Sequence, residues 1–153
     1  MTRLCIAGVG SAFGADRIGW DAVEAVAANA PPFSAEEVLL RCCAPFELPP
    51  LLATAEAAIL VDALVGDNKA RGWLLLDAAA LAPRHELSSH GFGIAQALAV
   101  LRALGRLPSP LLLYGIRIDD PAASAAPPLP DGLIAEIAHR AARILCRCRQ
   151  APA

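Results

Sequence analysis

The sequence has few charged side chains and no strong excess of either sign. Of its 153 residues, 18% are charged, and the net charge is -2 at pH 7. A weakly acidic chain exerts little attraction on a nucleic-acid backbone, so we expect no nucleic-acid partner. The hydrophobic fraction of 56% argues against disorder, because it is enough to build a sizeable core. At this length we expect one domain that spans residues 1–153.

Long apolar runs and targeting signals are also missing. No apolar stretch reaches the roughly 18 residues that a membrane-spanning helix needs. The first three residues lead directly into a short predicted strand and not into the apolar segment of a secretory signal. We therefore expect no membrane contact and predict a cytoplasmic protein.

The five cysteines do not form a metal-binding pattern. No CxxC pair occurs, which argues against a zinc site of the ribbon type. We expect reduced, structural thiols that are buried, with Cys5 as a small core residue of a strand. Catalysis by a cysteine and a histidine stays open, although neither Cys42 nor Cys43 has a recognisable activating neighbour in the sequence.

Several common catalytic and nucleotide-binding motifs are absent. The sequence contains no GK[ST] phosphate loop and no G-x-S-x-G elbow, so a serine hydrolase is not supported. In the glycine-rich turn that starts at Gly8 and Gly10, Phe13 replaces the third glycine of the dinucleotide fingerprint. A nucleotide-binding module that uses this turn remains one possible interpretation.

Apolar segments of two kinds alternate along the chain. Short continuous runs predict buried strands, and stripes at helical spacing predict amphipathic helices. The predicted strands are residues 3–9, 38–43, 57–64, 72–77 and 111–116. The predicted helices are residues 15–28, 50–55, 88–104 and 131–147. This alternation predicts an α/β fold with helices on both faces of a mainly parallel sheet, in which the strand at 72–77 runs antiparallel after a short connection.

Three polar side chains stand out at the predicted carboxyl edge of this sheet. Asp62 follows an apolar strand run, where an unpaired carboxylate is costly to bury. Asp16 follows the glycine-rich turn, and His90 opens a helix, where a positive charge is disfavoured. Simpler roles exist: Asp62 can accept hydrogen bonds from loop amides, and Asp16 can stabilise a helix dipole. Two carboxylates and one imidazole otherwise suit a metal such as zinc or nickel, with positions left open for water or substrate.

Three stretches together resemble the hydrogenase maturation endopeptidases, which remove the C-terminal extension from the large subunit of nickel–iron hydrogenases. Residues 8–19 (GVGSAFGADRIG) are similar to the opening glycine loop of the family, and residues 59–64 (ILVDAL) to its central strand. Residues 88–116, which include SSHGFG, LGRLP and YGI, are similar to its histidine helix and the strand that follows. The resemblance covers most of the chain in the same order.

This resemblance implies a three-layer α/β/α sandwich with a five-stranded sheet in the order 2-1-3-5-4 and an antiparallel fourth strand. It also implies that Asp16, Asp62 and His90 contact nickel that the large-subunit precursor supplies and that the free protein does not retain. The implied partner is that precursor, and the implied activity is that of a nickel-dependent processing endopeptidase. The resemblance assigns no catalytic nucleophile.

The chain departs from the family pattern at a few positions. Ser11 stands where asparagine is usual, and Ala15 replaces the first acid of the usual acidic pair. Residues 42–45 (CCAP) occupy the place of an acidic, glycine-rich turn after the second strand. These departures motivate an alternative, in which the chain is a non-catalytic relative that binds a metalloenzyme precursor as a maturation or chaperone factor.

Overall fold

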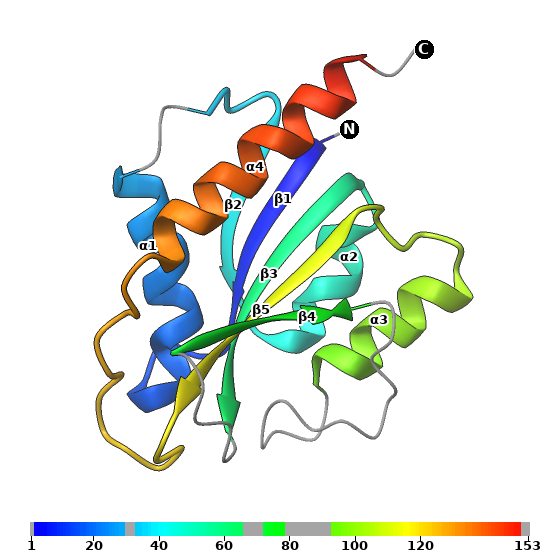
Figure 1. Cartoon of the computed structure of the whole chain (residues 1–153). Coiled ribbons are helices and arrows are strands. Elements are labelled where there is room, and N and C mark those ends of the chain that lie inside the picture. Colours follow the sequence, from blue (N-terminus) through cyan, green and yellow to red (C-terminus); the bar gives the residue numbers. More distant parts are fainter. Residues whose placement is uncertain (1, 30–32, 66–71, 79–92, 151–153) are drawn as a thin grey trace.

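A five-stranded sheet forms the centre of the computed structural model, which describes residues 2–29, 33–65, 72–78 and 93–150. The strands are β1 (Thr2–Val9), β2 (Val38–Cys43), β3 (Ala55–Val65), β4 (Trp73–Asp77) and β5 (Leu111–Ile118). Their order is β2-β1-β3-β5-β4, and only the pairing of β4 with β5 is antiparallel (Figure 1). This confirms the expected fold class, the strand order and the antiparallel strand.

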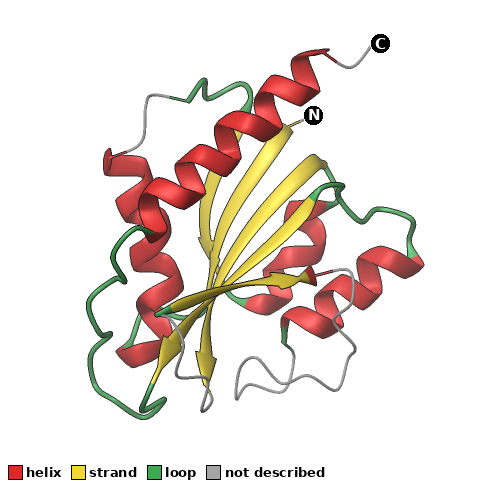
Figure 2. Cartoon of the chain, in the orientation of Figure 1, coloured by secondary structure: helices red, strands yellow, loops and turns green. Residues whose placement is uncertain are grey.

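Helices cover both faces of the sheet, as Figure 2 shows. The helical elements are η1 (Gly14–Arg17), α1 (Ile18–Asn29), η2 (Pro45–Glu47), α2 (Leu48–Leu52), α3 (Ile94–Ala103) and α4 (Leu133–Gln150). α1 and α4 pack on one face, and α2 and α3 pack on the other. The three-layer α/β/α arrangement is therefore confirmed.

β3 is central in the sheet, and its sequence explains why. Ile59 and Val61 belong to the core under α1 and α4, whereas Ala58 and Leu60 belong to the core under α2 and α3. All four side chains are fully buried. A strand that is covered on both faces needs apolar residues at successive positions, and this is the pattern from which the sequence predicted a central strand.

α1 lies unusually close to the carboxyl ends of β1 and β3, because two glycines meet there. A methyl group at Gly8 would lie 2.2 Å from the carbonyl oxygen of Gly19. A methyl group at Gly19 would lie 2.6 Å from the carbonyl oxygens of both Val9 and Val61. No side chain fits at either position without moving backbone, so these glycines set where α1 begins relative to the sheet.

Several element boundaries differ from the predicted ones, among them the starts of the predicted helices at 15–28 and 50–55. The predicted helix at 15–28 begins with the 3-10 turn η1 and becomes α-helical only at Ile18. The predicted helix at 50–55 is instead α2, which begins at Leu48 and carries Pro49 and Pro50 in its first turn. The first amide groups of a helix have no partner within the helix, so two prolines are tolerated there. The first residues of the predicted helix at 88–104 lie outside the described residues, and α3 is observed from Ile94.

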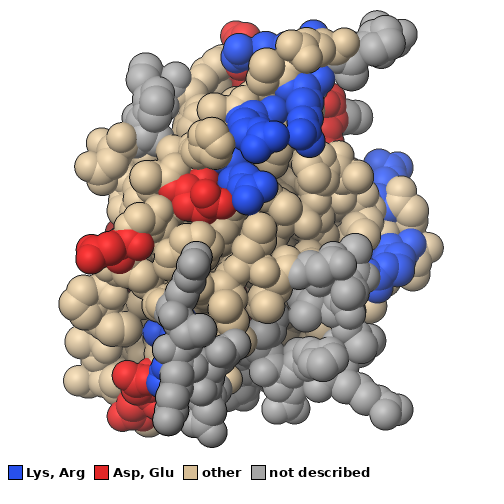
Figure 3. Space-filling view, in the orientation of Figure 1, with Lys and Arg blue, Asp and Glu red and all other residues tan. Residues whose placement is uncertain are grey.

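A polar contact joins α4 to the sheet. Tyr114 of β5 is fully buried, and its hydroxyl donates a 3.1 Å hydrogen bond to Glu136, which also accepts a 2.8 Å bond from Arg140. Basic side chains gather over α4 in the space-filling view (Figure 3). No helix within the described part of the chain is both long and apolar enough to cross a membrane.

The close approach of α1 to β1 gives the first prediction. The variant Gly8→Ala should lower the free energy of unfolding by about 2–3 kcal/mol, because its methyl group overlaps backbone atoms. Gly105→Ala is the control: nothing lies within 4 Å of that position, and only its left-handed backbone (φ +64°) opposes a side chain, at about 1 kcal/mol. Equal losses for the two variants in denaturant unfolding would contradict this account of the packing.

Candidate functional site

Asp62 lies inside β3, as the predicted strand at residues 57–64 implies, and not at the end of the strand. The strand continues for three residues to Val65, while the partner strand β1 ends at Val9. The Asp62 side chain is only 1% exposed. Its Oδ1 accepts a 2.8 Å hydrogen bond from the amide of Ala63, and its Oδ2 has no hydrogen-bond partner among the described residues. A buried carboxylate oxygen without a partner is costly, which points to a ligand or proton at this position.

Asp16 reaches the same edge from η1, in a loop that is held in place by its neighbours. A methyl group at Gly10, where φ is +150°, would lie 2.1 Å from the carbonyl oxygen of Asp16 and 3.4 Å from its Oδ1. The amide of Ala15 donates to the carbonyl oxygen of Ala123 at 3.1 Å, so the segment after β5 packs against η1. The backbone around Asp16 is therefore fixed from two sides.

Asp16 and Asp62 are close enough to interact electrostatically. Burial raises the pKa of Asp62 well above its usual value, and the negative charge of Asp16 raises that pKa further. The hydrogen bond from Ala63 opposes this effect. The structure thus brings together two of the three predicted ligands, and a cation between them would relieve both the burial penalty and the repulsion.

The third predicted ligand, His90, lies outside the described residues. Within residues 2–29, 33–65, 72–78 and 93–150, no group of three or more histidine, cysteine, aspartate and glutamate side chains is placed to hold a metal ion. His139, which the sequence placed on a solvated face, is exposed on α4. The acidic pair fits a divalent cation through the unpartnered Oδ2 of Asp62, and the complete ligand set remains a prediction.

The cysteines are free thiols, and their environments vary. Cys5 and Cys43 are buried, Cys42 and Cys148 are half-buried, and Cys146 is exposed, so the prediction of buried thiols is wrong for Cys146. Burial raises the pKa of Cys5 and of Cys43 to about 12, and it also raises the pKa of Cys42. These three thiols are protonated at neutral pH, which is the opposite of what a nucleophilic cysteine needs.

Arg17 supports the loop before Asp16 and Trp20 ties α1 to the end of β2, and neither residue was identified from the sequence. Arg17 pairs with Asp21 at 2.9 Å and with Glu24 at 3.0 Å, and its guanidinium also lies 3.5 Å from the carbonyl oxygen of Ala12. The indole of Trp20 donates a 3.1 Å hydrogen bond to the carbonyl oxygen of Cys43 at the end of β2. The sequence did contain a signal for the ion pairs of Arg17. Acidic residues follow this arginine four and seven positions later, and this spacing places all three charges on one face of a helix.

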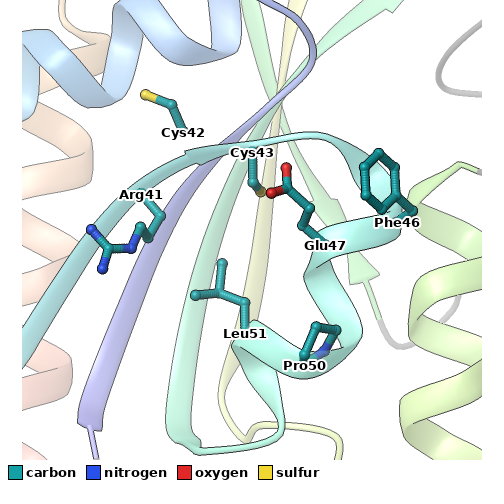
Figure 4. Close-up of a pocket in the computed structure, with 7 residues that line it drawn as sticks. All are labelled: Arg41, Cys42, Cys43, Phe46, Glu47, Pro50 and Leu51. Atoms are coloured by element: carbon teal, nitrogen blue, oxygen red, sulfur yellow. The ribbon is translucent and has the colours of Figure 1, made fainter.

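A pocket of about 480 Å³ opens beside β2, below the same edge of the sheet. Figure 4 shows that Cys43 and Leu51 border this pocket, while Cys42 points to the opposite side of β2, toward α1. The residues that line it come from β2, η2 and α2, namely Arg41, Cys42, Cys43, Phe46, Glu47, Pro50 and Leu51. Phe46 is 68% exposed, and Phe13, in the loop after β1, is 82% exposed.

Solved structures of hydrogenase maturation endopeptidases share this fold. No protein-family model matches the chain, and no curated protein matches it.

Three of the similar structures illustrate the likeness. The hydrogenase maturating endopeptidase HybD from E. coli is 24% identical, with a TM-score of 0.61, and the match covers 97% of this chain and 93% of that one. An endopeptidase from Escherichia coli, solved in solution, is 22% identical with a TM-score of 0.67 over the same shares of the two chains. The [NiFe] hydrogenase maturation protease HycI from Thermococcus kodakarensis is 21% identical with a TM-score of 0.60, over 98% of this chain and 94% of that one.

The buried carboxyl of Asp62 gives a prediction about stability and pH in the metal-free protein. The pKa of Asp62 is raised in the folded state. Between about pH 4 and this raised pKa, the Asp62 carboxyl therefore holds a proton in the folded chain but has lost it in the unfolded chain. The free energy of unfolding therefore falls as the pH rises through this range, and the loss is complete above the folded-state pKa.

The variant Asp62→Asn has no carboxyl group to ionise at this position, so its unfolding free energy should not fall in this way as the pH rises. We expect its unfolding free energy to exceed that of wild type at pH 8, with the difference shrinking toward pH 4. The control is Asp131→Asn at an exposed position, which should show no such pH-dependent difference. A constant difference between Asp62→Asn and wild type from pH 4 to pH 8 in chemical denaturation would contradict the assignment.

Proposed function

We propose that this protein is an endopeptidase that removes the C-terminal extension of a nickel–iron hydrogenase large-subunit precursor after nickel insertion. The observation that carries the proposal is the buried Asp62 carboxyl, whose Oδ2 has no partner among the described residues and whose neighbour is Asp16. This pair lies at the carboxyl edge of a sheet with the fold of the maturation endopeptidases. Open α/β sheets bind ligands at this edge.

We further propose that Asp16, Asp62 and His90 contact the nickel ion together. The ion arrives within the precursor, so it belongs to the substrate and not to the resting protein. Two carboxylates and one imidazole leave coordination positions free for the ligands that the precursor itself provides. Recognition of nickel would then restrict cleavage to precursors that are already loaded.

The electrostatics of the acidic pair favour such conditional binding. Without a cation, burial and the charge of Asp16 favour the protonated form of Asp62. Nickel binding requires the carboxylate, so the proton leaves as the ion enters. A bound Ni²⁺ can polarise a peptide carbonyl or lower the pKa of a water molecule. The buried thiols of Cys5 and Cys43 are protonated, so neither serves as the nucleophile.

The glycine-rich turn does not support the alternative of a nucleotide-binding module. The carboxylate of Asp16 lies beside Gly10, where a bound phosphate would have to approach the backbone. The negative charges of the Asp16 carboxylate and of a phosphate bound beside Gly10 would repel each other, and the sequence has no phosphate-binding motif that would offset this repulsion.

Cleavage of nickel-loaded precursor tests the proposed function. Wild type should trim the precursor, whereas Asp62→Asn and His90→Ala should reduce the rate at least about 100-fold, because each removes a ligand from the metal. The matched controls are Asp131→Asn and His139→Ala, which change exposed residues and should cleave at the wild-type rate. The rate is read from the loss of the extension by mass spectrometry.

Two outcomes would contradict the proposal. Wild-type rates for both Asp62→Asn and His90→Ala would refute the metal site. Binding of the nickel-loaded precursor without cleavage by wild type would instead favour the non-catalytic alternative, in which the chain acts as a maturation or chaperone factor. The replacement of the usual acidic turn by residues 42–45 motivates that alternative.

A further inference from the structure

β2 is an edge strand with an open side. It pairs with β1 alone, and no other described strand lies next to it (Figure 1). Edge strands carry unpaired backbone groups that can accept another strand, so proteins usually shorten, charge or cover them. β2 has six residues, and Arg41 is its one charged side chain.

The hydrogen bonds between β1 and β2 identify which backbone groups of β2 face away from the sheet. The carbonyl oxygens of Glu37 and Cys43 accept hydrogen bonds from the amides of Leu4 and Gly10, so odd-numbered residues of β2 direct their backbone toward β1. Backbone direction alternates along a strand, so Val38, Leu40 and Cys42 direct theirs away from β1. The amide of Val38 is bound by the carbonyl oxygen of Ser34, and no described residue pairs with the outward backbone groups of Leu40 and Cys42.

The pocket beside β2 lies next to this open edge. Leu51 and the exposed Pro50 of α2 give it an apolar floor, with Cys43 as the neighbouring wall (Figure 4). Arg41 also lines it, is exposed, and forms no ion pair with any described residue. The pocket therefore suits an apolar side chain, and its rim suits an adjacent acidic group.

We propose that the open edge of β2 binds an extended segment of the protein substrate as an added strand. The amide and carbonyl groups of Leu40 and Cys42 pair with this segment, an apolar side chain of the segment enters the pocket, and an acidic group beside it meets Arg41. This inference rests on the proposed function, because it names how the precursor reaches the site. Strand addition is a common mode of peptide recognition, in which backbone bonds supply affinity and pockets supply specificity.

The register relates this edge to the candidate metal site. Cys43 is opposite Val9, and Val61 is opposite Gly8, so Cys43 and Asp62 lie at the same level of the sheet, two strands apart. A strand added beside β2 is then three strand spacings, or roughly 14 Å, from Asp62. About four extended residues span that distance. The segment bound by β2 should therefore lie at least about four residues from the peptide bond that is cut.

Amide exchange tests the backbone pairing directly. In the free protein, the amides of Leu40 and Cys42 should exchange quickly, whereas the amide of Arg41 is protected by its bond to β1. Addition of nickel-loaded precursor should slow exchange at Leu40 and Cys42 by about tenfold or more and leave Arg41 unchanged. Exchange is measured residue by residue, with wild-type full-length protein. Tight binding of the precursor with no change at Leu40 and Cys42 would overturn the proposal.

A matched pair of variants gives a second test. Leu40→Pro removes the outward amide without removing a bond to β1, and Leu40→Ala shortens the same side chain but keeps the amide. Relative to Leu40→Ala, we expect Leu40→Pro to raise KM about 3- to 10-fold with kcat little changed. Equal KM values for the two folded variants would overturn the proposal. If circular dichroism shows that Leu40→Pro is unfolded, the exchange experiment decides.

The failure of this inference can be told apart from failure of the proposed function. If wild type binds the precursor with protection at Leu40 and Cys42 but does not cleave it, the added strand stands and the peptidase activity falls. If wild type cleaves the precursor without that protection, the activity stands and the added strand falls. Protection of these amides in the protein alone, together with a dimer in sedimentation experiments, would mean that a second copy of this chain occupies the edge, which also overturns the proposal.

Discussion

The burial of one carboxyl group, that of Asp62, constrains the rest of this structure. The group is 1% exposed, one of its oxygens has no partner among the described residues, and Asp16 adds a negative charge nearby. Such an arrangement opposes folding unless a proton or a cation is present. The close contacts at Gly8 and Gly19 fix the start of α1 against the carboxyl ends of β1 and β3. They thereby also position η1, which carries Asp16, near Asp62. Rigid packing around an unfavourable charge arrangement is typical of functional sites.

The fold was predictable because its signals are local and periodic. The apolar runs at 38–43, 57–64 and 111–116 each correspond to a strand, and the bounds of β2 agree with the prediction. The antiparallel strand follows from a connection too short for a crossover. The boundaries of α2 were missed because prolines were taken to fix its first residue, whereas the first turn accepts two of them. The strand order came from the family resemblance.

The site was predictable only in part. An aspartate in an apolar strand is visible in the sequence, and its burial is confirmed. The extension of β3 past the end of β1 was not predictable, because it depends on β5 continuing the pairing there. The hydrogen bond from Trp20 to Cys43, and the open edge of β2 with its pocket, depend on contacts between elements far apart in the sequence. A departure from the family pattern at residues 42–45 marked that region but did not reveal its geometry.

The most direct measurement is anomalous diffraction from crystals of the protein soaked with a nickel salt. The account predicts an anomalous peak within coordination distance, about 2.0–2.2 Å, of carboxylate oxygens of both Asp16 and Asp62 and of an imidazole nitrogen of His90. A peak that lacks Asp62, or a map in which Oδ2 of Asp62 is satisfied by a hydrogen bond with no metal at the edge of the sheet, would contradict the central claim.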